Sequence, residues 1–480
     1  MLFNSIDFAI FLPIVFAIYW LIGNRKGQNA FIVLSSFVFY GWWDWRFLFL
    51  MVGTALIDFW VGIRLQNQND SNRRKRLLTL SMCANLCVLG FFKYFNFFQT
   101  NFVEAFRFFG HEISPTSLQI VLPVGISFYT FQAMSYSIDV YRRKLEATHS
   151  VIDYLAFISF FPQLVAGPIE RATHLLPQFQ INRTFDYANA VNGMRQILWG
   201  LFKKVVIADN CAGIANTVFE NSASMPGSTL LIGAIFFSFQ IYGDFSGYSD
   251  IAIGTSRLFG FGLMRNFHFP YFSRDIAEFW RRWHISLSTW FRDYLYIPLG
   301  GSKGNTWSKV RNTFIIFIVS GFWHGANWTF IVWGLLNALY FLPLLIAGKN
   351  RENLDVVALN RLLPSVKEAG QILITFSLSM LAWIFFRAES LTHALTYLND
   401  LFSSTLFHAP DTTLIPQLKT ASVLLFFFLC LEWHGRASEY AIEKLLLNRH
   451  RLLRYTFYFI LFFTIMKLGG EKQEFIYFQF

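Results

Sequence analysis

The stretch SGFWHGANW, residues 320–328, places a titratable histidine inside a long apolar run, 312–345. A neutral imidazole can take up a proton at ordinary pH. His324 is therefore either a packing residue, hydrogen-bonded to a neighbouring helix, or a group that moves protons, and the residues alone leave both interpretations open. The run itself exceeds the roughly 20 apolar residues that a membrane-spanning helix needs. The fold class thus depends on whether such runs recur.

Apolar runs of this kind recur along the whole chain. The 480 residues are 54% hydrophobic and only 14% charged, whereas roughly 25% of residues are charged in soluble proteins. We therefore predict an all-α, polytopic integral membrane protein with about 11 or 12 spans and short re-entrant or interfacial helices. The predicted spans lie near 6–22, 30–42, 46–62, 77–95, 117–140, 190–209, 228–242, 248–262, 312–345, 370–386, 420–433 and 455–469. Of the apolar pieces, 30–42 and 157–168 are too short to cross a bilayer alone.

The net charge of +11 does not indicate a nucleic-acid partner, because the basic residues gather in short loops such as SNRRKR (71–76) and YRRK (141–144). A positive-inside bias explains this pattern more simply. It places both the N-terminus and the C-terminus on the outer side of the membrane. With no long extramembrane stretch, residues 1–480 are predicted to form one membrane domain, with an aromatic tail over 471–480.

Neither the cysteines nor the short sequence motifs indicate a disulfide framework, a metal site or a phosphate-binding loop. Cys83, Cys87, Cys211 and Cys430 lie in or beside apolar segments, so we expect small buried hydrophobes and no disulfide framework. The sequence contains no HExxH zinc motif and no Gly-rich phosphate loop, and we expect no bound metal.

Polar clusters concentrate between residues 240 and 330. A charged side chain at the bilayer centre costs about 2.5 to 3.5 kcal/mol, so such residues usually face a bundle interior or a wet cavity. On the residues alone, His284 is better explained as an interfacial residue next to two arginines. Asp244 and Asp250 accompany glycines with the spacing of close helix contacts, which favours an architectural role. A second Trp-His-Gly at 433–435 shows that this tripeptide is weak evidence by itself.

Several long segments in order resemble the membrane-bound O-acyltransferase (MBOAT) family, in the AlgI/PatA-like branch that O-acetylates alginate or peptidoglycan. The segments are DFSGYSDIAIG (244–254), FWRRWHISLSTWFRDYLYIPLGG (279–301) and SGFWHGANWTFIVWG (320–334), with LPVGISFYTFQAMSYSIDVYR (122–142) and LVAGPIER (164–171). The resemblance covers essentially the whole chain.

The resemblance implies a helical bundle around a transmembrane tunnel. In that family the essential histidine corresponds to His324, and a second polar position, often histidine in this branch, corresponds to His284. Both are therefore expected to be catalytic. Candidates for donor contact or tunnel lining are Arg281, Arg282, Arg292, Trp323 and Asn327. The arginines suit the phosphates of a cofactor-linked donor, although anchoring at the cytoplasmic surface explains them equally well.

The tail EFIYFQF (474–480) resembles the C-terminal aromatic motif of the same branch. By that resemblance Tyr477 accepts the acyl group from the His324 site and presents it outside. The alternative is an interfacial aromatic anchor.

The resemblance predicts an O-acyltransferase, specifically an O-acetyltransferase, in the bacterial inner membrane among its lipids. It implies acetyl-CoA as donor substrate, no permanently bound cofactor, a periplasmic SGNH-type O-acetyltransferase as partner, and a secreted or cell-wall polysaccharide as acceptor. Two alternatives remain: D-alanyl transfer of the teichoic-acid type, and a non-enzymatic polytopic transporter. A transporter often has two related halves, and the absence of such symmetry favours the enzyme.

Overall fold

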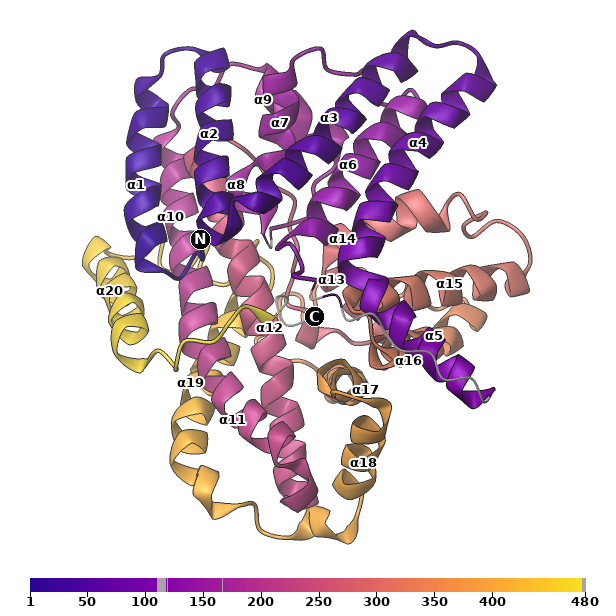
Figure 1. Ribbon diagram of the computed structural model, residues 1–480. Helices are drawn as coiled ribbons and strands as arrows, with labels where there is room; N and C mark the ends of the chain where they lie inside the picture. The colour runs from indigo at the N-terminus through magenta and orange to yellow at the C-terminus, as the bar shows by residue number, and fades with distance from the viewer. Residues whose placement is uncertain (110–117, 119, 166, 477–480) are drawn as a thin grey trace. The chain divides into compact units, whose positions relative to one another are not determined.

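The computed structural model describes residues 1–109, 118, 120–165 and 167–476 (Figure 1). Within these ranges the chain contains helices and no strand, which confirms the predicted all-α fold class. Six of the described helical segments are long and apolar enough to cross a membrane: Arg46–Asn67, Ser71–Phe108, Gly227–Leu258, Trp328–Ile346, Val366–Arg387 and Thr412–Gly435. These six segments agree with a polytopic membrane protein, and the number of about 11 or 12 spans stays a prediction.

The chain divides into two compact units, and the first comprises Met1–Ala190 with Thr255–Met264. Its helices are α1 (Ile6–Leu21), α2 (Arg25–Asp44), α3 (Arg46–Asn67), α4 (Ser71–Leu89), the π-helix η1 (Gly90–Tyr94), α5 (Phe95–Phe108), α6 (Ile126–Tyr141), α7 (Val151–Ser159), α8 (Phe161–Leu164) and α9 (Ala172–Gln180).

A buried carboxylate joins three helices of the first unit. Helices α3, α4 and α6 lie side by side (Figure 1). Asp58 of α3 accepts hydrogen bonds from Ser81 and Asn85 of α4 and from Ser137 of α6. A buried charge is tolerated where such donors satisfy its oxygens.

The second unit comprises Val191–Gly254 and Arg265–Phe480. Its helices are α10 (Tyr187–Leu201, which begins in the first unit), the π-helix η2 (Phe202–Ala208), α11 (Asp209–Glu220), η3 (Ser222–Ser224), α12 (Gly227–Leu258, which ends in the first unit), η4 (Pro270–Phe272), α13 (Ile276–Arg282), α14 (Ile285–Phe291), η5 (Arg292–Tyr296), α15 (Thr306–His324), α16 (Trp328–Ile346), α17 (Val366–Arg387), α18 (Leu391–Leu401), η6 (Ser404–Phe407), η7 (Thr412–Leu414), α19 (Ile415–Gly435) and α20 (Arg451–Leu468).

Glycines bring α15 and α16 into close contact as a helical hairpin. A Cβ on Gly321 would lie 2.2 Å from the carbonyl oxygen of Phe330, and one on Gly334 would lie 2.4 Å from that of Phe317. Both distances are far below van der Waals contact, so a larger residue would force the helices apart. Helices α13 and α17 pack against α16 as well, and this group of helices carries the candidate site.

Two of the predicted span boundaries are wrong, and each error has a local cause. The predicted run 312–345 is two helices, because Gly325 is extended and Asn327 caps the start of α16. The predicted spans 228–242 and 248–262 are instead one helix of 32 residues, α12. Its polar centre does not break the helix, since the aspartates there find partners on another helix of the second unit.

Other predicted span boundaries differ from the observed helix boundaries by a helix turn or more. The predicted span 77–95 is part of a continuous helical segment, α4 to α5, and α6 begins only at Ile126 rather than near residue 117. The piece 30–42, predicted to be too short, lies within the 20-residue helix α2. The prediction of one membrane domain over 1–480 stays a prediction.

The cysteine prediction was partly wrong. Cys211 is buried, but Cys83, Cys87 and Cys430 lie on exposed helix faces. In a membrane an apolar face need not be covered by protein, because lipid chains are as apolar as a protein core. An apolar run therefore does not imply that each of its residues is packed inside the molecule.

Candidate functional site

The two predicted catalytic histidines, 284 and 324, lie together in the second unit. Their ring centroids are 6.3 Å apart and the ring planes are inclined by 70°. Both side chains are buried: His284 is 1% exposed and His324 is 4% exposed. A centroid distance of this size with inclined planes is within the range of edge-on ring contacts, so the structure brings both imidazoles to one place in the fold.

A tight turn fixes His324 at the end of its helix. His324 is the last residue of α15, and the extended Gly325 follows it. A Cβ on Gly325 would lie 2.1 Å from a ring atom of Phe330, so the turn packs directly on the first turn of α16. Asn327 accepts a hydrogen bond from the Thr329 N–H at 3.0 Å and donates one to the carbonyl of Glu389 at 3.0 Å. The predicted tunnel residue Asn327 thus has contacts that hold the turn.

Aromatic side chains surround His324. Its ring centroid is 5.0 Å from that of Trp323, 5.1 Å from Trp333 and 5.3 Å from Phe386, all in steeply inclined arrangements. The predicted residue Trp323 is buried and also lies 6.2 Å from the ring of His284. These apolar walls limit access of water to the two imidazoles, which strengthens any polar interaction between them and a bound group.

His284 is held in an uncommon backbone conformation at the start of α14. Its φ of 42° and ψ of 54° are left-handed, which costs a non-glycine residue about 1 to 2 kcal/mol. Asn266 stabilises the conformation: its carbonyl accepts from the Ile285 N–H at 2.8 Å and its side-chain oxygen from the Ser286 hydroxyl at 2.9 Å. Its amide donates to Ser249 of α12 at 3.0 Å. Sequence reasoning missed Asn266, because no motif or periodicity marks it.

Burial determines the protonation of His284. The ring packs edge-on against Phe245 with centroids 4.6 Å apart. Burial lowers the pKa of His284 to about 3, so the imidazole is neutral at neutral pH and can both donate and accept a hydrogen bond. The ring is enclosed by protein, and the interfacial position of His284 stays a prediction.

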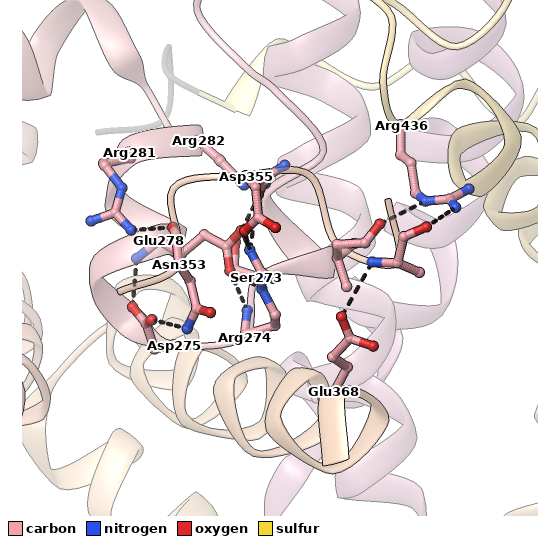
Figure 2. A network of polar contacts seen from close by, with 12 residues as sticks. Ser273, Arg274, Asp275, Glu278, Arg281, Arg282, Asn353, Asp355, Glu368 and Arg436 are labelled. Carbon is pink, nitrogen blue, oxygen red and sulfur yellow. Dashed lines mark hydrogen bonds and ion pairs between the residues drawn. The ribbon is translucent and has the colours of Figure 1, made fainter. Parts of the chain in front are cut away.

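The predicted donor-binding arginines of α13 make contacts with a loop (Figure 2). Arg281 donates to the carbonyls of Asn350 and Asn353 at 2.8 and 2.7 Å. Arg282 donates to Glu278 at 2.7 Å and to the carbonyl of Asp355 at 3.1 Å. These bonds attach the loop 349–361 to α13.

Further ion pairs complete this network. Arg274 bridges Glu278 and Asp355, with N–O distances of 3.1 and 2.8 Å (Figure 2). The hydrogen bond from Arg274 lowers the pKa of Asp355. Arg292 takes no part in the bonds drawn there: it lies on η5, is 58% exposed and pairs with its neighbour Asp293. The three predicted arginines therefore do not form one cluster, and their role toward a phosphate stays a prediction.

The predicted architectural aspartates pair with two adjacent lysines of η2. Asp244 lies 2.9 Å from the Lys204 ammonium, and Asp250 forms an ion pair with Lys203. Close helix contact accompanies the pairs, since a Cβ on Gly247 would lie 2.8 Å from the carbonyl of Gly200. The two lysines were not identified from the sequence. Two lysines in one apolar segment and two aspartates in another nevertheless indicate that the segments pair, because charged residues inside a membrane protein usually have partners of opposite charge.

Among the described residues, no group of three or more His, Cys, Asp or Glu side chains is arranged to hold a metal ion. The candidate acyl relay Tyr477 lies outside the described residues. The site as described is therefore an imidazole pair within aromatic walls.

The fold and the site define a polytopic membrane protein with a buried histidine centre. Residues 71–356, which include both histidines, match the model of the membrane-bound O-acyltransferase family, MBOAT. The chain belongs to this family and is a multi-pass membrane O-acyltransferase. Family membership decides against the non-enzymatic transporter.

Curated relatives extend the match beyond the family model. A protein of Pseudomonas putida named "Probable alginate O-acetylase AlgI" is 38% identical over 501 aligned positions, covering 100% of both chains. Its namesake from Pseudomonas aeruginosa is 42% identical over 84% of this chain and 75% of the relative. A "Peptidoglycan O-acetyltransferase" of Helicobacter pylori is 37% identical over 84% of this chain and 80% of the relative. The predicted AlgI/PatA-like branch is thereby confirmed.

Proposed function

We propose that this enzyme moves an acetyl group from a cytoplasmic thioester, acetyl-CoA, across the bacterial inner membrane for O-acetylation of a secreted or cell-wall polysaccharide. The observation that carries the proposal is the pair of buried imidazoles, 6.3 Å apart within aromatic walls. The names of the relatives, which refer to alginate and peptidoglycan O-acetylation, support the acetyl group and the polysaccharide acceptor.

The proposed chemistry needs one base and one hydrogen-bond donor. The acceptor hydroxyl gives its proton to His324, its oxygen forms a bond to the acetyl carbonyl carbon, and the carbon–sulfur bond breaks. The proton then passes from His324 to the departing thiolate, so that the products are an ester and a thiol. General base catalysis of this kind contributes about 10²- to 10⁴-fold to the rate.

His284 suits the second role because it is neutral and enclosed. In the proposal its N–H donates to the carbonyl oxygen, on which negative charge develops during attack. Such a donor is most effective when it is fixed in advance in a site without water. The hydrogen bonds that Asn266 accepts from residues 285 and 286 supply that fixation. Exclusion of water also protects the thioester from hydrolysis.

We propose Tyr477 as the acyl relay to a periplasmic SGNH-type O-acetyltransferase. The position of its chain neighbours supports this role. The Phe475 ring is 6.1 Å from that of Phe245, which is 4.6 Å from the ring of His284. The phenol of Tyr477 would be the acceptor hydroxyl in the chemistry above, and the resulting phenyl ester is reactive enough to pass its acetyl group to a second enzyme.

The test uses the full chain in lipid nanodiscs with radiolabelled acetyl-CoA. We would measure thiol release and locate the label by peptide mass spectrometry in wild type, His324→Ala, Tyr477→Phe and the control His434→Ala. We expect label on Tyr477 in wild type and the control, and in neither of the other two. A D-alanyl carrier-protein thioester, offered in a parallel reaction, is expected to give no transfer.

Two results would count against the proposal. Retention of polysaccharide acetylation in cells that carry His324→Ala would remove His324 from the reaction. Absence of label in every protein, in spite of polysaccharide acetylation by the same cells, would mean direct transfer to the partner or another donor. Tyr477 would then be an interfacial anchor.

A further inference from the structure

The chain following α20 is buried in the second unit although it lies close to the C-terminus. Phe475 and Ile476 are each 1% exposed. Terminal residues are usually poorly ordered unless specific contacts hold them. The segment 470–476 contains several polar and charged residues, so apolar packing alone does not account for its course.

A buried ionic cluster holds the far end of this segment. The Ile476 N–H donates to one oxygen of Asp244 at 2.7 Å. Lys204 lies 2.9 Å from the other oxygen of Asp244 and 2.8 Å from Asp209, and it donates to the carbonyl of Gln473 at 3.2 Å. All three charged side chains are at most 3% exposed.

The charges of the cluster explain why the segment binds there. One ammonium faces two carboxylates, and buried charges are costly unless further hydrogen bonds satisfy them. The segment supplies such bonds from its backbone, an N–H to Asp244 and a carbonyl to Lys204. Hydrogen bonds between a backbone N–H and a carboxylate are among the stronger ones in proteins.

The near end of the segment is fitted to the same helices. The Gly470 N–H donates to the carbonyl of Val205 at 3.0 Å. A Cβ on Gly470 would lie 2.5 Å from the carbonyl carbon of Asp209, so glycine allows the backbone to lie directly on the start of α11. Between the two ends, Asn216 donates to the side-chain oxygen of Gln473 at 3.3 Å.

The docked segment reaches the candidate site through aromatic contacts. Phe475 packs on Tyr248 with centroids 4.3 Å apart, and its ring lies 6.1 Å from that of Phe245. Phe245 in turn packs edge-on against His284. The described tail therefore supports the wall on which one catalytic imidazole rests.

We propose that Lys204, Asp209 and Asp244 form an intramolecular docking site for residues 470–476, and that docking positions His284 through Phe475 and Phe245. The charged residues are positioning residues, because they act on the reaction through the tail. The positioning step rests on the proposed function, whereas the docking itself can be measured without any turnover.

The neighbouring ion pair provides a matched control. Lys203 and Asp250 come from the same two helical segments as Lys204 and Asp244 and are similarly buried. Asp250 bonds to Lys203 and to Gln196 of α10, and Lys203 also donates to Ser246. Asp250→Asn thus perturbs a buried aspartate of α12 whose partners lie within the helices rather than in the segment 470–476.

The docking experiment is hydrogen exchange of the full chain in lipid nanodiscs, read by mass spectrometry on peptides that contain 470–476. We expect exchange at least tenfold faster than wild type in Asp244→Ala and in Gly470→Val. Gly470→Val matters because it displaces the segment without removing a charge. Asp250→Asn and Gly213→Ala, whose Cβ would meet nothing within 4 Å, are expected to stay within twofold of wild type. Wild-type exchange in both Asp244→Ala and Gly470→Val would overturn the docking.

The positioning step is tested on the same preparations by acetyl-CoA turnover. We expect kcat to fall at least tenfold in Gly470→Val while KM for acetyl-CoA stays within threefold. Asp244→Ala should lower kcat as well. Asp244→Asn keeps an acceptor oxygen for the Ile476 N–H and should therefore recover part of the kcat that Asp244→Ala loses. Faster exchange with wild-type kcat would overturn the positioning of His284. If the wild type fails to turn over acetyl-CoA but its segment responds as described, the proposed function is contradicted and the docking is supported.

Discussion

The chain contains the tripeptide Trp-His-Gly twice, at 323–325 and 433–435, and the two copies differ completely in environment. Both close an apolar helix, α15 and α19. His324 is buried among aromatic rings, whereas His434 is exposed. Trp433 donates to the carbonyl of Leu362 at 2.7 Å and takes the Arg436 guanidinium over its ring at 4.3 Å.

The glycines of the two tripeptides have the same role. A Cβ on Gly325 would meet the Phe330 ring at 2.1 Å, and one on Gly435 would meet the carbonyl of Ala441 at 2.3 Å. In each copy the glycine lets the chain turn closely at the end of a helix. The local sequence therefore specifies the turn, and the helices packed around it specify whether the histidine can do chemistry.

The largest expected difference between the copies is in activity. His324→Ala should lower acetyl transfer about 10³-fold, because it removes the proposed general base, whereas His434→Ala should stay within about twofold of wild type. The measurement is thiol release from acetyl-CoA by equal amounts of folded protein, as judged by size-exclusion chromatography. An equal loss of acetyl transfer in His324→Ala and His434→Ala would show that burial does not distinguish a catalytic histidine from a structural one here.

Substitution of the glycines separates stability from positioning. Gly325→Ala and Gly435→Ala should each destabilise the protein by about 1 to 3 kcal/mol through overpacking. Only Gly325→Ala should also lower kcat, by about 10- to 100-fold, since small displacements of a reacting group are costly. Thermal unfolding and turnover of the folded fraction would be measured together. Wild-type kcat in folded Gly325→Ala would contradict the prediction.

His284, the second histidine of the site, is expected to make the free energy of unfolding depend on pH. Burial lowers the pKa of His284 to about 3, below the roughly 6.5 of an unfolded chain. Because the unfolded state binds the proton more readily, the free energy of unfolding should fall as the pH drops below about 6.5, by about 2 kcal/mol at pH 5.0. His284→Gln removes this contribution. Its melting temperature should therefore change less than that of wild type between pH 7.5 and 5.0, and an equal change would refute the assignment.

The smallest expected effects come from the tryptophans. Trp433→Phe loses the hydrogen bond to Leu362 and should cost about 1 kcal/mol of stability with turnover unchanged. Trp323→Phe alters a wall of the site and should lower kcat by about two- to fivefold, with little change in melting temperature. A reversed pattern, with activity lost at position 433, would place the second tripeptide in the functional machinery.

Much of the fold class could be predicted because its cause is local. A low content of charge and repeated apolar runs require helices that satisfy their own backbone hydrogen bonds in lipid. The boundaries were less predictable, since the polar centre of α12 resembles a break between two spans. Asp244 and Asp250 do not break the helix because Lys204 and Lys203 neutralise them from another segment.

The candidate site was predictable to a similar degree. His324 and His284 were identified from motifs, and the structure brings them together. Asn266, which holds the backbone of residue 284, could not be found, because its bonds join segments far apart in sequence. Arg281 and Arg282 were expected near a donor, and their contacts with the loop 349–361 could be seen only once that loop was placed (Figure 2).

The sequence by itself determined that this chain is a helical membrane protein and that it carries the motifs of an acyltransferase family. These properties follow from hydropathy and local residue patterns, which act over a few residues, whereas the turn that ends α15 at His324 became visible only in the structure. Only the tertiary structure decided which histidine is enclosed, which lysine neutralises which aspartate, and that residues 470–476 lie on a buried ionic cluster. Burial and ion pairing depend on groups that are remote in sequence, so packing alone can fix them.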